Sequence, residues 1–215
     1  MRFVAANTTI PVPRVSPSSY TYIVMDYCPG VEAQAAWNSI SLREQMALLA
    51  ELKGFVQQLR DLEPPSPKAV SSTHGGACRD HRFGTIPVGP FNTHTDFHQF
   101  LRNDSPLDDW DTHYPEVSGA HSRPCSSKYT HGDLAPRNVL VHNGKISAII
   151  DWDSAGWRPE YWEFTKVHFA CAGTPGEWFK ALGDSAGQDY SVQLAAEMVL
   201  WRAAESPADP VTYFD

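Results

Sequence analysis

Apolar residues recur every three or four positions between Ser41 and Leu62, and this spacing predicts the longest helix of the chain. Ser41 and Glu44 have the S-x-x-E spacing of a capping box, which marks a helix N-terminus. One face of the predicted helix is formed by Leu42, Met46, Leu49, Leu52, Phe55, Val56, Leu59 and Leu62.

Three shorter segments show the same period. A helix is predicted from Thr95 to Arg102, where two phenylalanines and a leucine share one face. Another is predicted from about Glu160 to Ala172, with Pro159 in its first turn, where proline is tolerated. The last predicted helix runs from Val192 to Ala204, so helices occupy much of the second half of the chain.

Other segments are predicted to be strands or irregular chain. Alternate prolines exclude a helix from residues 10–17 and predict extended backbone. Residues 20–30 are rich in aromatic and β-branched side chains and end in Pro-Gly, which predicts a strand that ends in a turn. Residues 63–90 and most of 103–128 lack a sustained period, so we predict long irregular connections there.

A β-hairpin is predicted from Val139–His142 and Lys145–Ile150. These strands flank Asn143-Gly144, the pair that favours a two-residue type I′ turn. In an unbroken ladder Asn138 would lie opposite Ile149. Asp151, which follows the returning strand, would then lie beside Asn138.

Three polar side chains are expected to converge at the foot of this hairpin, namely Asp133, Asn138 and Asp151. A carboxylate and an amide oxygen on neighbouring strands suit Mg²⁺ when phosphate oxygens and water complete its coordination. Asp133 could then accept a proton from an attacking hydroxyl. Alternatively, the three residues are ordinary polar groups that cap turns and strand ends, although their common spacing around one hairpin favours a site.

Composition narrows the function classes. The chain has 215 residues, of which 42% are apolar, and a formal charge of −8, so we expect neither nucleic acid nor an anionic membrane as a partner. No signal-peptide core or membrane-spanning stretch is predicted. The cysteines are far apart, which fits a reduced cytoplasmic protein without a disulfide framework or zinc knuckle: Cys28, Cys78, Cys125 and Cys171.

The sequence also resembles a known family. His131-Gly132-Asp133 followed by Asn138, and then Ile150-Asp151-Trp152, resembles the H-G-D-x-x-x-x-N and I-D-[FW] signature of the aminoglycoside phosphotransferase and choline kinase group. Further stretches resemble the branch of this group abundant in fungi, at 10–15, 22–30, 75–84, 89–101 and 155–164. The resemblance implies an α+β, protein-kinase-like fold with a mainly helical C-lobe and a small β-hairpin at the catalytic loop.

The resemblance also implies a reaction, the ATP-dependent phosphorylation of a small-molecule hydroxyl. It makes Asp133 the catalytic base and gives Asn138 and Asp151 to Mg²⁺. His131 would be a structural member of the loop that bonds backbone near Asp151. The adenine of ATP, or the guanine of GTP, would be held by the backbone of Asp26, Tyr27 and Cys28.

The N-terminal part departs from the family pattern. Residues 1–30 would be residual N-lobe strands and hinge, and 31–215 the C-lobe. No lysine, glutamate or glycine precedes Asp26, although a kinase-like N-lobe needs a Gly-rich loop, a lysine and a glutamate. We therefore expect a truncated N-lobe, weak nucleotide affinity and little turnover. The alternative is a catalytically silent or repurposed protein that binds a small ligand, itself or a protein partner on the exposed N-lobe side.

Two competing motifs are weaker. Ser185 lies in a G-x-S-x-G sequence, but the serine hydrolase elbow needs a strand before the serine, and the preceding residues have a helical pattern. His94 and His98 could share a helix face and bind zinc, yet no third ligand is placed nearby, and packing explains their helix.

Several further side chains are assigned structural roles. Glu163 is expected to pair with an arginine, for example Arg137 or Arg158. Asp153 is either a second metal contact or a solvated acid, and we favour the solvated acid. A cationic acceptor, which the family's substrates suggest, would be attracted by acidic residues if these faced the cleft: Asp108, Asp109, Asp111 and Glu116. Most tryptophans are expected in the core.

Overall fold

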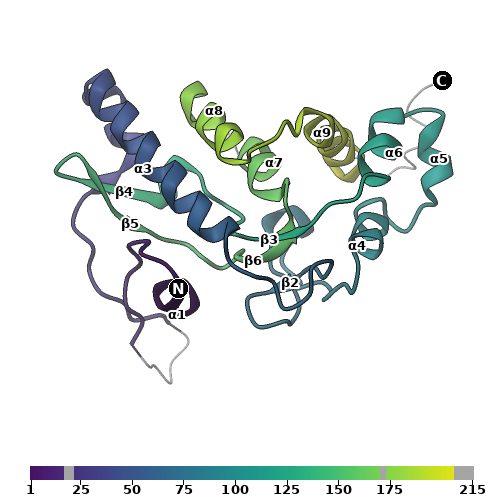
Figure 1. Cartoon of the computed structure of the whole chain (residues 1–215), viewed down its shortest axis with the longest axis horizontal. Coiled ribbons are helices and arrows are strands. Elements are labelled where there is room, and N and C mark those ends of the chain that lie inside the picture. The colour runs from purple at the N-terminus through teal and green to yellow at the C-terminus, as the bar shows by residue number, and fades with distance from the viewer. Residues whose placement is uncertain (17–21, 170–172, 206–215) are drawn as a thin grey trace.

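The computed structural model describes residues 1–16, 22–169 and 173–205, and Figure 1 shows how these segments are arranged. The α-helices are α1 (Arg2–Asn7), α2 (Ala33–Ala36), α3 (Leu42–Arg60), α4 (His94–Leu101), α5 (Leu107–Asp111), α6 (Pro115–His121), α7 (Trp162–Phe169), α8 (Gly176–Ser185) and α9 (Ser191–Glu205). The 3₁₀ helices are η1 (Trp37–Ser39), η2 (His81–Phe83) and η3 (Pro136–Asn138). The strands are β1 (Val31–Glu32), β2 (Ser71–Ser72), β3 (Ser127–Thr130), β4 (Val139–His142), β5 (Lys145–Ile149) and β6 (Gly156–Pro159).

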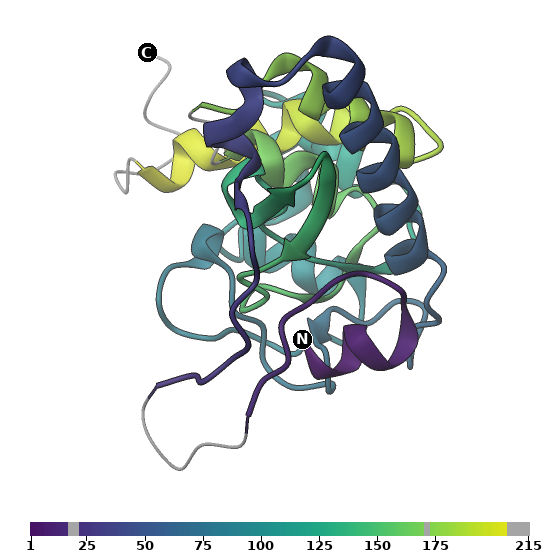
Figure 2. The same cartoon turned by 90° about the vertical axis from the view of Figure 1, so that its left-hand side faces the viewer.

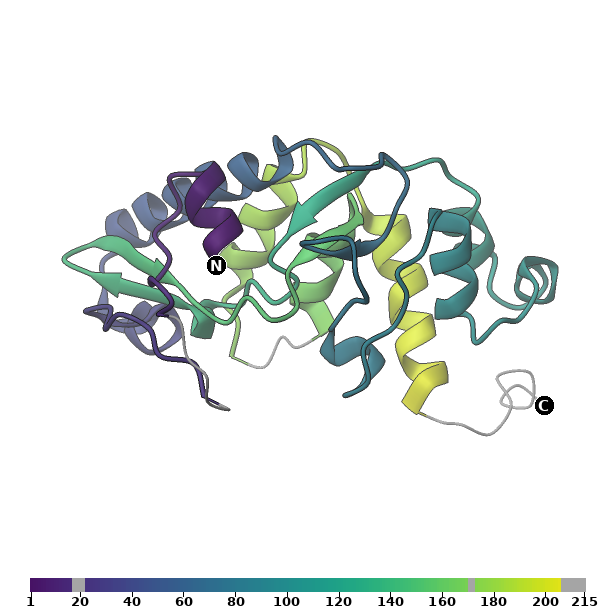
Figure 3. The ribbon, with the colours of Figure 1, turned by 90° about the horizontal axis from the view of Figure 1, so that it is seen from below.

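The strands of the described residues form two small antiparallel sheets. Their orders are β1-β4-β5 and β2-β6-β3. Helices surround both sheets, with α3, α8, α7 and α9 on one side and α4 to α6 at one end (Figures 1 and 3). The fold is therefore mixed α+β, as the sequence predicted. Within the described residues no helix is both long enough and apolar enough to cross a membrane.

Helix α3 confirms the prediction from its apolar period. Ser41 Oγ accepts from Glu44 N at 3.3 Å, and the Glu44 carboxylate accepts from Ser41 N at 2.8 Å, so the capping box is complete. Leu48 and Leu52 are buried against the hairpin and α8. Leu42 and Met46, which share the predicted face, are exposed because the first turns of α3 extend beyond that core.

The β4–β5 hairpin has the predicted turn but a different register. Asn143 and Gly144 both have positive φ, 50° and 74°, as a type I′ turn requires. A β-bulge follows Leu140, so Val139, and not Asn138, lies opposite Ile149. Ser147 is the extra residue, and its hydroxyl donates to Pro29 O at 2.6 Å. The bulge therefore ties the hairpin to the segment that precedes β1.

Gly30 makes this close approach possible. Its φ is 128°, and a Cβ there would lie 2.5 Å from Val141 O. No side chain fits between the two backbones, so glycine is required at this position.

The strand predicted at 20–30 is wrong for residues 22–30. Tyr20 and Thr21 lie outside the described residues. Only a short ladder forms, in which Asp26 N donates to Arg14 O at 3.0 Å and Ser16 N donates to Val24 O at 2.9 Å. The aromatic and β-branched side chains are exposed, 87% in the case of Tyr27. A strand pattern needs a neighbouring strand and a core, and this arm projects from the rest of the molecule (Figure 2).

The prediction for Pro159 is also wrong. Pro159 ends β6, and Trp162 begins α7. The main body of the predicted helix is confirmed up to Phe169, whereas its last three residues lie outside the described part of the chain.

The two irregular connections contain more structure than predicted. Residues 63–90 include β2, which pairs with β6, and the 3₁₀ turn η2. Residues 103–128 include α5 and α6, which bury Trp110 and Val117. These helices are too short for their period to be recognised in a sequence.

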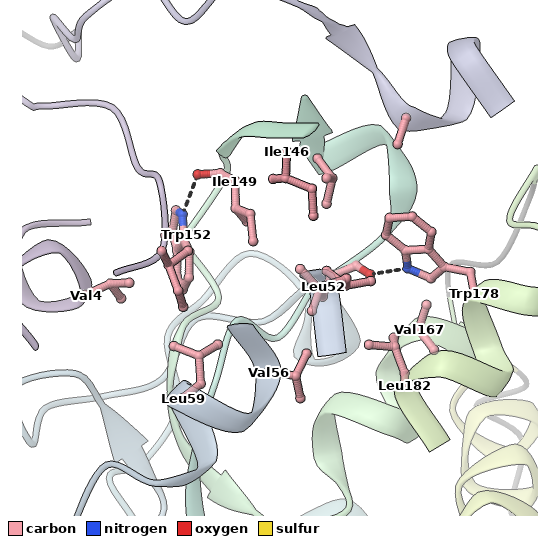
Figure 4. Packing of buried hydrophobic residues seen from close by; sticks show 14 of the residues in the cluster. Val4, Leu52, Val56, Leu59, Ile146, Ile149, Trp152, Val167, Trp178 and Leu182 are labelled. Atoms are coloured by element: carbon pink, nitrogen blue, oxygen red, sulfur yellow. Dashed lines mark hydrogen bonds between the residues drawn. The ribbon is translucent and has the colours of Figure 1, made fainter. Parts of the chain in front are cut away.

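The core consists of two hydrophobic clusters, one around α3 and the hairpin and one around α4, α6 and α9. Figure 4 shows the first cluster, in which Leu52, Val56 and Leu59 of α3 lie among residues of the hairpin and α8. Most tryptophans are buried as predicted: Trp37, Trp110, Trp152, Trp157, Trp162 and Trp178. Trp178 donates its indole N–H to Leu134 O at 2.9 Å, which joins α8 to the loop before the hairpin.

Candidate functional site

The candidate site is the loop between β3 and β4. Gly132 has a φ of 79°, and a Cβ on it would lie 2.7 Å from Ser154 O. The loop therefore turns back tightly against the segment that follows β5, and glycine permits that contact. This turn brings His131 and Asp133 next to the feet of the hairpin.

Glu163 of α7 holds the backbone of this loop. Its carboxylate accepts from His131 N at 2.6 Å and from Gly132 N at 3.2 Å. The predicted pairing of Glu163 with an arginine is wrong: Arg158 donates to backbone carbonyls, such as Ser71 O at 2.7 Å, and Arg137 donates to Asp133. Glu163 is an architectural residue, but its partners are main-chain amides.

Burial raises the pKa of Glu163 to about 7, against the opposing effect of the backbone N–H groups that it accepts from. The pKa of Glu163 is higher in the folded than in the unfolded protein, so protonated Glu163 favours the folded state. This contribution to stability is fully present below pH 4.5 and is lost as the pH rises through about 7.

Glu163→Gln tests this linkage, because the amide imitates the protonated acid and does not titrate. We expect the free energy of unfolding of the wild type to fall relative to that of E163Q between pH 4.5 and 7, by roughly 3 kcal/mol. Urea unfolding of both proteins at several pH values measures the difference. If the wild type gained stability relative to E163Q over this range, the two N–H bonds would outweigh the cost of burial.

The Asp133 carboxylate is buried and receives several donors. Arg137 Nη2 lies 2.7 and 2.8 Å from its two oxygens, and Asn138 Nδ2 donates to Oδ2 at 2.8 Å. Asn138 Nδ2 also donates to the Asp133 carbonyl at 2.8 Å. The side-chain nitrogen of Asn138 thus donates within the loop, which leaves the side-chain oxygen Oδ1 for another partner.

Asp151 lies at the other foot of the hairpin, where Ile150 N donates to Asn138 O at 2.9 Å. Its φ is 62°, and its side chain is exposed. Partial burial and the nearby carboxylates of Asp153 and Asp133 raise its pKa, whereas His81 and Arg137 lower it. Asp151 is therefore within electrostatic range of both Asp133 and Arg137.

A cation would relieve this crowding of carboxylates. The side-chain oxygen of Asn138 and the Asp151 carboxylate are hard oxygen ligands for a metal ion. No described residue donates a hydrogen bond to the Asp151 side chain. Two protein ligands fit Mg²⁺, which commonly keeps waters and substrate phosphates as its other ligands. The donor set thus fits the expected metal.

His131 supports both feet of the hairpin. Its Nε2 lies 2.9 Å from Ile150 O, which is the backbone contact expected beside Asp151, and its Nδ1 accepts from Asp133 N at 3.2 Å. Its ring packs on Trp152, with centroids 4.4 Å apart. Burial lowers the pKa of His131 to about 4, so the imidazole is neutral at physiological pH and does not act as a charged group.

Asp26, Tyr27 and Cys28, the predicted hinge residues, lie on the projecting arm, far from the Asp133 cluster in the sequence. Asp26 N donates a hydrogen bond to Arg14 O, and Cys28 Sγ lies 3.9 Å from Asp26 O. Cys28, Cys78 and Cys125 are unpaired thiols among the described residues, whereas Cys171 lies outside them. The Ser147–Pro29 bond at the bulge joins the end of this predicted hinge segment to the hairpin.

The competing motifs have structural roles. Ser185 ends α8 and donates to Ala181 O at 2.8 Å, and a helix, not a strand, precedes it, so it is not on a nucleophile elbow. His94 and His98 make side-chain bonds to Ser127 and to Tyr161, both at 2.9 Å. No group of three or more metal-binding side chains of the His, Cys, Asp or Glu type was found in the described residues.

Two features of the site were not predicted from the sequence. Arg137 was expected near Glu163, but its i,i+4 spacing from Asp133 within the loop could have indicated the ion pair. The electrostatic effect of His81 on the pKa of Asp151 spans a long sequence separation, and no local signal predicts it. Asp153 is exposed, as expected of a solvated acid.

Comparison with known proteins shows the family of this chain. A model of the phosphotransferase enzyme family matches residues 1–194, which is most of the chain. The chain belongs to the phosphotransferase enzyme family. No curated protein sequence matches it significantly.

Solved structures similar to this phosphotransferase family member are themselves phosphotransferases. The ADP-bound aminoglycoside phosphotransferase APH(2'')-Ib has a TM-score of 0.60 at 14% identity, over 100% of this chain and 74% of that one. A thermostable mutant of APH(4)-Ia, in ternary complex with ADP and hygromycin B, has a TM-score of 0.58 at 18% identity, over 99% and 77%. The macrolide 2'-phosphotransferase MphH from Brachybacterium faecium has a TM-score of 0.51 at 15% identity, over 95% and 71%.

At these identities the likeness establishes the fold. It is the kinase-like fold of aminoglycoside phosphotransferases. At the level of the family, the match supports a small-molecule phosphotransferase.

Proposed function

We propose that the chain transfers the terminal phosphoryl group of a nucleoside triphosphate to a hydroxyl of a small molecule. The observation that carries this proposal is the pairing of Asp133 with Asn138 beside Asp151, at the two feet of one hairpin. Asp133 would accept the hydroxyl proton, and Asn138 and Asp151 would hold Mg²⁺. Bound Mg²⁺ would neutralise negative charge on the phosphate oxygens.

The chain's own residues prepare this reaction. Glu163 and His131 fix the loop backbone, and Asn138 orients the Asp133 carboxylate through its amide N–H. Arg137 is 35% exposed and lies on the same carboxylate, within electrostatic range of Asp151. Its guanidinium provides a positive charge beside both acids, where the donor's phosphates would approach.

The finer assignments are part of the same proposal. The donor is ATP or GTP, held by the backbone of residues 26–28, and the acceptor is a hydroxyl compound that an acidic surface could favour if it is cationic. Membership of the fungal-type branch, a reduced N-lobe and a cytoplasmic location remain predictions. The exposed arm at residues 22–27 is where a protein partner or a second copy would bind.

The first experiment is a calorimetric titration of MgATP into the 215-residue protein. Asp151→Asn is expected to weaken the affinity tenfold or more, because removing a metal ligand should cost at least as much as removing its outer-shell support, about 10-fold to 100-fold. Asp153→Asn is the matched control, since Asp153 is a neighbouring exposed acid with only a weak contact to Ser154 at 3.3 Å, and it should change the affinity much less.

Equal effects of the two substitutions would contradict the assignment of Asp151. A folded wild type that binds no MgATP would favour the alternative of a silent or repurposed scaffold.

A further inference from the structure

A cavity of about 470 Å³ lies between the η2 loop, the ends of α4 and α9, and α5. These helices gather at one end of the molecule in Figure 1. Most of the lining residues are apolar or aromatic, with Phe83, Phe100, Trp110 and Leu200 among them, although polar groups also contribute to the wall. Its volume is within the range of small-molecule sites.

Two arginines line this cavity, Arg82 and Arg102. Arg82 is neutralised, because its Nε lies 3.3 Å from Oε2 of Glu197, and both side chains are almost fully buried. Arg102 is only 6% exposed and forms no ion pair with any described residue. A buried arginine normally has an anionic partner, and the described residues supply none to Arg102.

The neighbours of Arg102 do not supply a negative charge. Arg102 donates from Nη1 to His121 Nδ1 at 2.7 Å and from Nε to Ser105 O at 3.3 Å. Burial, together with His98, Arg102 and Arg82, lowers the pKa of His121 to about 2, so this ring is a neutral acceptor. The described residues give the Nη2 group of Arg102 no hydrogen-bond acceptor. One donor group of the guanidinium thus remains for a ligand.

We infer that this cavity binds a small aromatic or aliphatic molecule that carries a carboxylate. The apolar and aromatic side chains would enclose the body of the ligand, and the guanidinium of Arg102 would receive the carboxylate in a charge-assisted hydrogen bond. The inference goes beyond the proposed phosphoryl transfer, because it requires neither nucleotide nor Asp133.

Three probes of one shape test the charge preference: naphthalene-2-carboxylate, 2-naphthylmethanol and 2-naphthylmethylammonium. Each is titrated into the nucleotide-free protein while the indole N–H resonance of Trp110 is followed by NMR, after assignment with Trp110→Phe. The carboxylate is expected to bind at least tenfold more tightly than the alcohol, and the ammonium compound most weakly. Equal affinity for carboxylate and alcohol would overturn the inference.

Variants locate the site. Arg102→Gln is expected to remove the advantage of the carboxylate over the alcohol, whereas Arg102→Lys keeps the charge and should retain most of it. Ala204→Phe places a ring into the cavity from the exposed end of α9, so it is expected to weaken binding of all three probes without altering a buried contact. If A204F bound the carboxylate as tightly as the wild type, the probe would lie elsewhere and the inference would fail.

Discussion

Asp133→Asn is expected to lower kcat for phosphoryl transfer by about 10²-fold to 10⁴-fold, whatever the rate of the unmodified chain. The amide has the shape of the carboxylate but cannot accept the hydroxyl proton at neutral pH. The hydrogen bond from Asn138 can persist, since an amide oxygen also accepts, whereas Arg137 loses its charged partner. Release of nucleoside diphosphate in the presence of an acceptor measures the effect.

Nucleotide affinity provides the control for this substitution. Asn138 and Asp151 are unchanged in D133N, so the Kd for MgATP and the melting temperature are expected to stay close to those of the wild type. A variant that turns over at the wild-type rate would exclude Asp133 as the base. A loss of MgATP binding together with turnover would instead assign Asp133 to the metal.

Asp80→Ala is expected to destabilise the protein by roughly 3–5 kcal/mol, because it leaves a buried ammonium without its counter-ion. Asp80 Oδ1 lies 2.6 Å from Lys166 Nζ, and both side chains are almost completely buried. The same carboxylate accepts from the Trp162 indole at 3.0 Å and from Arg82 N at 2.9 Å. The substitution therefore breaks an ion pair and two further bonds that join η2 to α7.

A double-mutant cycle separates the ion pair from the other bonds. In the double variant D80A/K166M no unpaired charge remains, so we expect it to be more stable than D80A alone. Urea unfolding of the wild type, both single variants and the double variant gives the coupling free energy. If the two destabilisations were simply additive, the uncompensated charge of Lys166 would not be the main cost.

Local sequence signals predicted elements whose cause is itself local. The long period of α3, its Ser41 and Glu44 capping box, and the Asn143-Gly144 turn each act within a few residues, so they were readable from the chain alone. The segment around Tyr22 to Met25 has strand-forming side chains but remains almost unpaired, because strand formation depends on a neighbour that the described residues barely supply. The conformation of that segment therefore depends on its tertiary neighbours and not on its own side chains.

The site was predictable to a similar extent. The spacing of Asp133, Asn138 and Asp151 around one hairpin indicated that they lie near each other. The partners of these residues were less accessible, because a side chain such as Glu163 can be satisfied equally by an arginine or by two main-chain amides. A buried charge such as that of Arg102, to which the described residues supply no anionic partner, becomes visible only when the surrounding elements are known.

The extra residue in β5 limits how this protein can change in length. Ser147 has no partner in β4, because Leu140 pairs with Ala148 and Val141 with Ile146, so deleting it would leave these pairs as a regular ladder and Asp151 in its present phase. The same deletion would remove the hydroxyl that anchors Pro29. Insertions of two residues at the Asn143-Gly144 turn would preserve both relations. Length variants of this hairpin should therefore be tolerated best at the turn and in even steps, while the loss of Ser147 would release the segment before β1 from the hairpin.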